Sequence, residues 1–564
     1  MDNNGYDLKS LHLPRLAGMS LALITRLVES PLTRGLITGS LFESAGINEM
    51  RAHPISDPPT FLPHPPSIEE PGAGLPASPD NFAELIAERP VAVGFSYNTI
   101  QDFAQAYRDG TTSPVEVAEH ALEAIETSNA HQPPLRAIIA CNPDEVRAQA
   151  LASEKRLRTG QALGSLDGVP VAVKDEVDMA GFATFGGTSF LGKSIAQNDA
   201  FAVARLRAAG ALLVGKANMH EIGIGVTGFN QHHGTTRNPY DLQRHTGGSS
   251  SGPATAVASG LVPLALGADG GGSIRIPAGL CGLVGLKPTF GRVSESGALP
   301  LCWSVAHIGP IGATARDVAI GYAIMAGVDP ADPHTHHQPV PTLVGFENHD
   351  LQALALGVYW PWFRHATPEI VQACEAALER LQELGATIRE ITLPELEPAR
   401  VAHMVIITSE MCKSLEDAYL AHRQDFSLEV RYDLAMARLF TARDYLQAQR
   451  IRTRTIRHFE QALEQVNVIL TPTTAVTAPP IRPDALSRGE SDINVLTEIM
   501  RYATPANLTG HPAISFPVGY DSAGLPIGLQ AIGRYWEEHL LLRLANAYES
   551  FFERRQPVLS YRLL

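Results

Sequence analysis

Short apolar runs alternate with helix-like segments through most of the chain. Residues 168–173 and 211–214 are apolar runs of strand length, and between them a helical pattern at 200–209 begins at Asp199. Apolar strands that alternate with helices predict an α/β fold, with a central sheet covered by helices on both faces. We expect this sheet to be mixed, twisted and largely parallel, and residues 91–564 to form a single large domain around it.

Longer amphipathic segments follow residue 330. They fall at 368–384, 398–422 and 428–465, and we expect each to be a helix. Strand-like runs return at 466–470 and 513–518, and a last helix is expected at 537–553. No repeat of 20 to 50 residues is present, which argues against a solenoid.

Residues 1–52 have a pattern of their own. Helical spacing relates Leu13, Leu16, Met19, Leu23 and Leu27, and a second apolar set follows Pro31. This predicts an arm of two amphipathic helices, which either packs on its own domain or contacts lipid or an apolar substrate. Residues 53–90 contain many prolines, so we expect an extended strap on the surface.

Composition excludes several classes of protein. The 564-residue chain has a formal net charge of −15 and no basic stripe, so no nucleic-acid partner is expected. Its five cysteines are scattered, which indicates neither a disulfide framework nor a zinc site and favours a reducing compartment. The apolar run at 16–28 is shorter than a membrane-spanning helix requires. We expect a cytoplasmic protein, with peripheral membrane contact through residues 1–50 left open.

Three short motifs match known patterns but lack the context that those patterns need. Residues 248–252 fit the nucleophile elbow of α/β-hydrolases, but a polar loop precedes them where a buried strand is required. The glycines at 223–228 fit a dinucleotide fingerprint, but no strand leads into them. His334, His336 and His337 lie in a proline-rich loop without a carboxylate or cysteine pattern nearby. We expect neither a nucleotide nor a metal site at these positions.

A glycine-rich stretch that ends in Ser273 is the stronger candidate for catalysis. Ser273 follows Gly270, Gly271 and Gly272. Consecutive N–H groups in such a turn can bind a developing oxyanion, and side chains there would crowd a carbonyl group. The pattern predicts acyl transfer on Ser273, with an oxyanion site made by residues 270–273.

A serine nucleophile also needs a base, and the base need not be histidine. A lysine can take that role if burial keeps its amine neutral. Lys174, Lys216 and Lys287 each follow an apolar run. The residue pattern leaves the choice open, with Lys174 and Lys216 nearly equal.

Several ordered strings resemble the amidase signature family. They are residues 169–175, 215–221, 236–239, 247–252, 270–277 and 524–530, and the likeness extends from about residue 95 to the C-terminus. The resemblance implies that Lys174 is the buried base, that Ser249 is a bridging serine held by a cis peptide bond, and that Ser273 is the nucleophile. It also implies supporting roles for Ser250, Asp269 and Arg275, and a structural role for Lys216.

A narrower likeness is to the fatty acid amide hydrolases of plants. It rests on residues 13–18, 28–30, 61–63, 248–252, 269–273 and 471–474. It implies hydrolysis of long-chain amides such as N-acylethanolamines, a small-molecule substrate, through an acyl-enzyme and with no metal or organic cofactor. Two alternatives stay open, namely a short-chain, aryl or carbamate hydrolase of the same family and a subunit of a glutamine-dependent amidotransferase. We also expect a homodimer.

Overall fold

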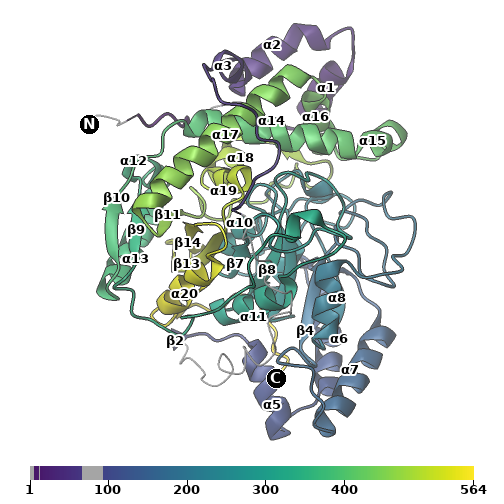
Figure 1. Ribbon diagram of the computed structural model, residues 1–564. Coiled ribbons are helices and arrows are strands. Elements are labelled where there is room, and N and C mark those ends of the chain that lie inside the picture. The colour runs from purple at the N-terminus through teal and green to yellow at the C-terminus, as the bar shows by residue number, and fades with distance from the viewer. Residues whose placement is uncertain (1–4, 12, 67–92) are drawn as a thin grey trace.

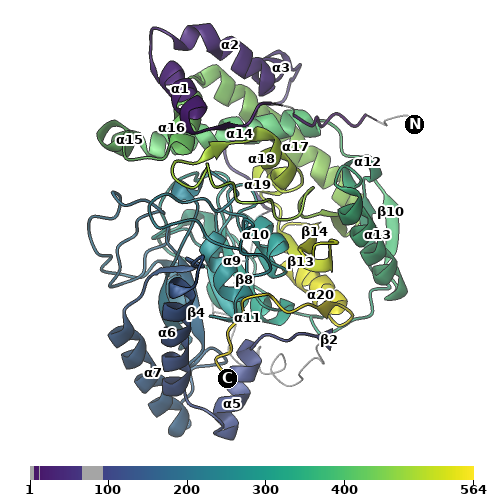
Figure 2. The same cartoon turned by 180° about the vertical axis from the view of Figure 1, so that it is seen from behind.

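The computed structural model describes residues 5–11, 13–66 and 93–564 (Figure 1). One large sheet runs through the body of the molecule, and the amino-terminal helices lie at one end, next to helices from the later half of the chain (Figures 1 and 2). Of the expected strap, residues 67–90 lie outside the described residues.

The large sheet has eleven strands in the part of the chain that the structure describes, in the order β10-β9-β11-β14-β13-β7-β8-β6-β4-β5-β3. In chain order they are β3 (Ile138–Ala140), β4 (Pro170–Lys174), β5 (Leu212–Ala217), β6 (Leu264–Ala268), β7 (Val284–Lys287), β8 (Ile308–Gly312), β9 (Ala355–Val358), β10 (Thr387–Glu390), β11 (Val468–Pro472), β13 (Ala513–Tyr520) and β14 (Pro526–Gly533). Two small sheets pair β1 (Leu16–Ala17) with β12 (Glu490–Ser491) and β2 (Val93–Gly94) with β15 (Glu553–Arg554).

The strand directions correct one expectation. Strand β4 is parallel to both β5 and β6, and β9 is parallel to both β10 and β11. The other neighbours in the large sheet are antiparallel. The prediction of a mixed sheet is confirmed, but the sheet is not largely parallel. Strands that are covered on both faces read as apolar runs whichever way they point, so the pattern could not give their direction.

Helices surround the sheet and form a second layer at one end. Those around the sheet are α5 (Ile100–Asp109), α6 (Pro114–Ala130), α7 (Pro143–Arg158), α8 (Phe201–Ala208), α9 (Ser251–Ala258), α10 (Arg275–Leu280), α11 (Ala315–Met325), α12 (Trp360–Phe363), α13 (Pro368–Glu383) and α20 (Glu538–Glu549). The second layer holds α14 (Leu396–Ser414), α15 (Glu416–His422), α16 (Leu428–Ala437), α17 (Ala442–Gln465), α18 (Ile493–Met500) and α19 (Thr504–Thr509). The arm holds α1 (Gly18–Glu29), α2 (Arg34–Ser44) and α3 (Ile47–Ala52), and short 3₁₀ turns are η2 (Glu221–Gly223) and η3 (Pro333–Thr335).

Helices cover both faces of the sheet, as predicted. On strand β6, Gly267 faces Ile274 and Ser250, which lie beside α10 and α9. On the same strand, Leu264 packs against Gly321 of α11. Successive residues of a strand point to opposite faces of the sheet, so Gly267 and Leu264 contact helices on opposite faces. The loops that precede α9 and α10 therefore share one face, and these loops carry the serines of interest.

Three details of the expected helices were wrong. The segment expected as one helix at 398–422 forms α14 and α15, and the segment at 428–465 forms α16 and α17. Asp199 does not cap α8, because its carboxylate pairs with Arg207 instead, at 2.6 Å. A continuous apolar period does not reveal such breaks, because the packed face keeps its spacing across a short turn.

The arm packs on the second layer of helices (Figure 2). Leu21 and Val28 of α1 are buried against Leu428 and Tyr432 of α16. The arm is helical, as predicted, but it holds three helices in place of the two expected. Leu16 of the expected apolar stripe packs against this cluster, whereas other members of the apolar sets are exposed. Met19 and Leu23 of α1 are 91% and 59% exposed. Leu32, just before α2, and Leu36 of α2 are 92% and 83% exposed. Every helix that the structure describes is too short or too polar to cross a lipid bilayer.

Candidate active site

Lys174 ends β4, the strand that lies between β6 and β5. It is 1% exposed, and its Nζ lies 2.9 Å from Ser249 Oγ and 3.1 Å from the Ala268 carbonyl oxygen. Burial lowers the pKa of Lys174 because the ammonium form loses hydration, and the Glu176 carboxylate, 3.3 Å from Nζ, opposes that shift. A buried amine in contact with a hydroxyl group meets the requirement for a lysine base.

Backbone hydrogen bonds hold the loop that carries Ser249. The peptide bond before Ser249 is cis. The His220 N–H donates to the Ser249 carbonyl oxygen at 3.0 Å, and the Ser250 N–H donates to the Ser273 carbonyl oxygen at 3.2 Å. The Ser250 hydroxyl donates to the Ala268 carbonyl oxygen at 3.0 Å. Ser250 therefore ties the Ser249 loop to the Ser273 loop and to the end of β6.

Ser273 lies on the adjoining loop and is 4% exposed. Its hydroxyl forms no hydrogen bond with any described residue, so no hydrogen-bond partner restricts its rotation about χ1. The backbone bond to Ser250 keeps the two serines on adjoining loops. The structure thus brings Lys174, Ser249 and Ser273 together, although the two hydroxyls are not bonded to each other in the described chain.

The loop before Ser273 offers three N–H groups. Asp269 accepts a hydrogen bond from the Gly272 N–H at 2.6 Å. The N–H groups of Gly270, Gly271 and Ser273 donate to no group among the described residues. The four N–H groups expected to bind an oxyanion are therefore not equivalent, because that of Gly272 is already engaged.

Gly272 shows why this loop is rich in glycine. Its φ is +114°, and a Cβ there would lie 2.5 Å from Ile276 and 2.6 Å from Ala503. A Cβ on Gly270 would lie 2.9 Å from Cys302 Sγ. Only glycine permits both this backbone conformation and this close approach.

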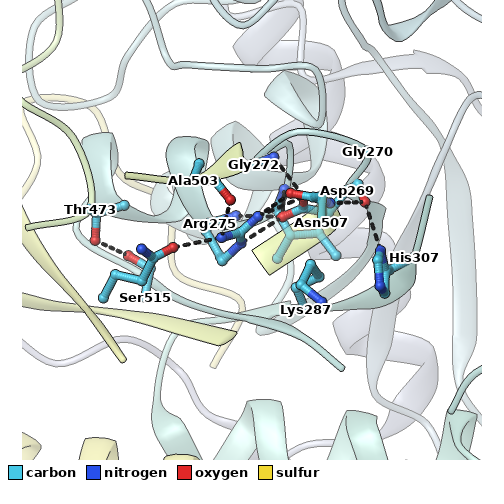
Figure 3. Close-up of polar contacts among 12 residues, drawn as sticks. Asp269, Gly270, Gly272, Arg275, Lys287, His307, Thr473, Ala503, Asn507 and Ser515 are labelled. Carbon is cyan, nitrogen blue, oxygen red and sulfur yellow. Dashed lines mark hydrogen bonds and ion pairs between the residues drawn. The ribbon is translucent and has the colours of Figure 1, made fainter. Parts of the chain in front are cut away.

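Arg275 holds the Asp269 carboxylate in place (Figure 3). Arg275 Nε lies 3.0 Å from Asp269 Oδ2, and the guanidinium donates to Asn507 and to Gln530, at 2.6 Å in each case. Asn507 donates to the Asp269 carboxylate at 2.8 Å. Burial alone would raise the pKa of Asp269, but the Arg275 guanidinium holds that pKa below its usual range. The carboxylate therefore stays ionised and continues to accept the hydrogen bonds of the loop.

The other two candidate lysines do not contact a serine hydroxyl in the described chain. Lys216 Nζ donates to the Val177 carbonyl oxygen and lies 3.9 Å from Asp175, and burial lowers the pKa of Lys216 to about 8. Lys287 Nζ donates to the Pro288 carbonyl oxygen at 2.9 Å, and burial lowers its pKa. All three amines are buried, so burial does not distinguish them, whereas contact with Ser249 does.

Two of the weak motifs, at 223–228 and at His334, also lack in the structure the context that their patterns need. Gly223 lies in the turn η2 and not between a strand and a helix. His334 lies in η3 and packs against Phe290. No group of three or more metal-ligating side chains occurs among the residues that the structure describes.

Glu176, Asn507 and Gln530 belong to the site but were not predicted from the sequence. Glu176 stands two residues after Lys174 but lies in the turn that follows β4, so the alternation of side chains along a strand could not place it beside Lys174. Gln530 ends one of the strings that resemble the family. Asn507 gave no signal, because a single asparagine in a short helix has no pattern.

Comparison with known proteins identifies the family. A family model described as Amidase matches residues 116–542. The chain belongs to the amidase signature family. It is therefore an amidase, a hydrolase of amide bonds. The fatty acid amide hydrolase of Oryza sativa subsp. indica is 42% identical over 579 residues, which cover 98% of this chain and 95% of the rice protein.

Other relatives match a smaller part of this amidase. A glutamyl-tRNA(Gln) amidotransferase subunit of Roseiflexus sp. (strain RS-1) is 37% identical over 478 residues, which cover 80% of this chain and 96% of that protein. The native peptide amidase from Stenotrophomonas maltophilia has a TM-score of 0.70 at 29% identity, and the match covers 82% of this chain and 98% of that structure. The nearly full-length match to the rice protein, in contrast, includes the arm.

Proposed function

We propose that this amidase cleaves long-chain fatty acid amides, N-acylethanolamines among them, into a fatty acid and an amine through an acyl-enzyme on Ser273. The observation that carries the proposal is the buried contact of 2.9 Å between Lys174 Nζ and Ser249 Oγ, beside the Ser273 loop. The name of the rice relative, which matches 98% of the chain, supports the substrate class.

The proposed reaction moves one proton along three side chains. Neutral Lys174 takes the proton of Ser249 while Ser249 takes that of Ser273, whose Oγ attacks the amide carbonyl carbon. The N–H groups of Gly270, Gly271 and Ser273 bind the oxyanion. Ser249 and Lys174 then return the proton to the nitrogen, because an amine leaves far more easily than its anion. Water cleaves the acyl-enzyme by the same relay and restores Ser273.

Apolar side chains from the second helix layer support a long acyl chain. A Cβ on Gly270 would lie 3.3 Å from Ile407 of α14, so this helix stands directly over the loop. Ile407 packs on a buried cluster that includes Val405 of α14 and Val430 of α16, together with Phe42 of the arm. Each methylene that is buried contributes about 0.8 kcal/mol, so we place the acyl chain along this cluster.

The purified chain should prefer amides with long acyl groups. In a series of N-acylethanolamines from C2 to C20, kcat/KM should rise by at least about 100-fold between C2 and C16, since each added methylene can contribute about 0.8 kcal/mol. Steady-state kinetics below the micelle concentration of each substrate measure this. A flat series would favour the short-chain or aryl amidase. An amidotransferase subunit would hydrolyse none of these amides without its partner.

The exposed apolar residues of the arm support peripheral membrane contact, which we include in the proposal. Met19 and Leu23 of α1, Leu32 in the turn before α2 and Leu36 of α2 are exposed apolar side chains. Changing all four to serine should weaken binding to phosphatidylcholine vesicles by at least about tenfold, because apolar area drives interfacial binding. Vesicle flotation measures this.

The matched control is Leu151→Ser. Leu151 is 59% exposed on α7, which lies at the opposite end of the molecule from the arm (Figure 1). The control variant should bind vesicles as the unchanged protein does, and both variants should keep their turnover of a water-soluble short amide. Unchanged vesicle binding by the fourfold variant would refute membrane contact. If that variant instead changed from dimer to monomer in sedimentation, the surface would belong to the expected homodimer.

A further inference from the structure

His403 reaches the oxyanion loop from the second helix layer. It lies on α14, is 1% exposed, and its Nε2 is 2.8 Å from the Gly270 carbonyl oxygen. Because a carbonyl oxygen only accepts, Nε2 carries the hydrogen. Burial lowers the pKa of His403 to about 4, so the imidazole is neutral at neutral pH and acts as a fixed hydrogen-bond donor.

This hydrogen bond sets the direction of the next N–H group. The cis peptide bonds of the described chain lie elsewhere, so the peptide between Gly270 and Gly271 is trans. In a planar trans peptide the C=O and the N–H point in opposite directions. The carbonyl of Gly270 points at α14, and the N–H of Gly271 therefore points away from α14. That N–H is one of the three without a partner in the described residues.

The peptide has no other anchor in the described chain. Asp269 holds the later part of the loop through the N–H groups of Gly272 and Ile274 (Figure 3). Gly270 and Gly271 have no side chains, and their remaining backbone groups form no hydrogen bond with described residues. Without the bond to His403, no hydrogen bond to a described residue would fix the orientation of this peptide, and glycine itself opposes few backbone conformations.

Close packing adds to the hydrogen bond. A Cβ on Gly271 would lie 2.9 Å from His403 Cε1 and 3.1 Å from Met500 Cε. The imidazole thus lies against the loop and limits its movement. A hydrogen bond on the carbonyl oxygen also polarises the peptide and makes its N–H a stronger donor.

We propose that His403 is a positioning residue that orients the Gly271 N–H towards the oxyanion. The proposal rests on the proposed serine mechanism. His403 does not touch the reacting atoms and passes no proton. Its effect is on the transition state, where the oxyanion carries full charge, and much less on the bound amide. Since α14 also contributes to the apolar cluster, one helix positions the oxyanion donor and lines the proposed acyl site.

Two variants of His403 distinguish the loss of its hydrogen-bond donor from the loss of the volume of its ring. His403→Leu removes the N–H, and His403→Gln keeps an amide N–H at a similar reach. In His403→Leu, kcat should fall by about 10- to 100-fold while KM changes by less than about threefold, a smaller loss than removal of a whole oxyanion donor. His403→Gln should stay within about fivefold of the unchanged enzyme. Binding of a trifluoromethyl ketone analogue of the substrate should weaken in His403→Leu by the same factor as kcat/KM.

Several results would overturn the proposal. Equal kcat in His403→Leu and His403→Gln would show that the donor does not matter, and a loss confined to KM would place His403 in substrate binding. A shifted acidic limb of the pH profile would make His403 a proton carrier. If His403→Leu does not fold, His403→Asn replaces it, because the shorter amide cannot reach Gly270. His458→Leu on α17 is the control, and it should keep kcat and KM.

A fluorophosphonate probe separates the two proposals. If Ser273 is labelled and required for turnover while His403→Leu keeps full kcat, only the role of His403 fails. If Ser273→Ala keeps full activity, the serine mechanism fails and the role of His403 fails with it.

Discussion

Replacing Ser273 with alanine should abolish amide turnover and leave the fold unchanged. The hydroxyl of Ser273 forms no hydrogen bond with described residues, so its removal leaves no buried partner unsatisfied. Without the nucleophile no acyl-enzyme forms, and kcat should fall by at least about 10⁴-fold. Turnover of a C16 amide, intact-mass detection of the acyl-enzyme and the midpoint of thermal unfolding measure the three parts of this expectation.

Ser251→Ala is the control for that loss. Ser251 lies three positions after Gly248, the glycine of the cis peptide bond. It is buried, and its hydroxyl also has no hydrogen-bond partner in the described chain. It therefore matches Ser273 as a buried serine whose hydroxyl has no partner among the described residues, and it lies outside the relay. Ser251→Ala should keep turnover within about twofold, as expected for a group outside the chemistry. Full activity in Ser273→Ala, or equal losses in both variants, would disprove the nucleophile.

The sequence predicted which segments form the candidate site, but not which of their side chains contact one another. Glycines before Ser273 predicted a loop whose N–H groups can bind an oxyanion, and three N–H groups of residues 270–273 have no partner among the described residues. The apolar runs before Lys174, Lys216 and Lys287 made each lysine a candidate for the base, and all three lysines are buried. Which amine meets a serine depends on how strands pack side by side, and no single run carries that information.

Contacts across long stretches of chain explain why other residues of the site could not be predicted. Asn507 meets Asp269 across 238 residues, and His403 meets Gly270 across 133 residues. Each stands in a helix that holds other polar residues, and no pattern in the sequence sets it apart from them. The arm shows a similar limit, because a helical period predicts α1 but not which side of α1 meets α16. The buried side includes Thr25, a polar residue that donates to its own helix at Leu21.

Replacing Lys174 with alanine should lower kcat/KM by about 10³-fold or more at neutral pH. The relay would then have no base for the proton of Ser249, and a positioned base contributes about 10²- to 10⁴-fold. Ser249 would also lose its contact of 2.9 Å. Steady-state kinetics on a C16 amide and on its ester check this. The ester should suffer less, because an alkoxide leaves more easily than an amide anion. Near-normal amidase activity in Lys174→Ala would refute the assignment.

The pH dependence of kcat/KM tests Lys174 as the base, because Glu176 affects the pKa of Lys174. Only the neutral amine accepts a proton, so kcat/KM should rise with pH through the pKa of Lys174. Burial lowers this pKa and the Glu176 carboxylate raises it, with a further contribution from Asp269. Glu176→Gln removes a charge that stabilises the ammonium form, so the acidic limb should move to lower pH, while Glu176→Asp should leave it closer to its original place. An acidic limb that stays in place in Glu176→Gln would mean that another group, and not Lys174, sets the profile.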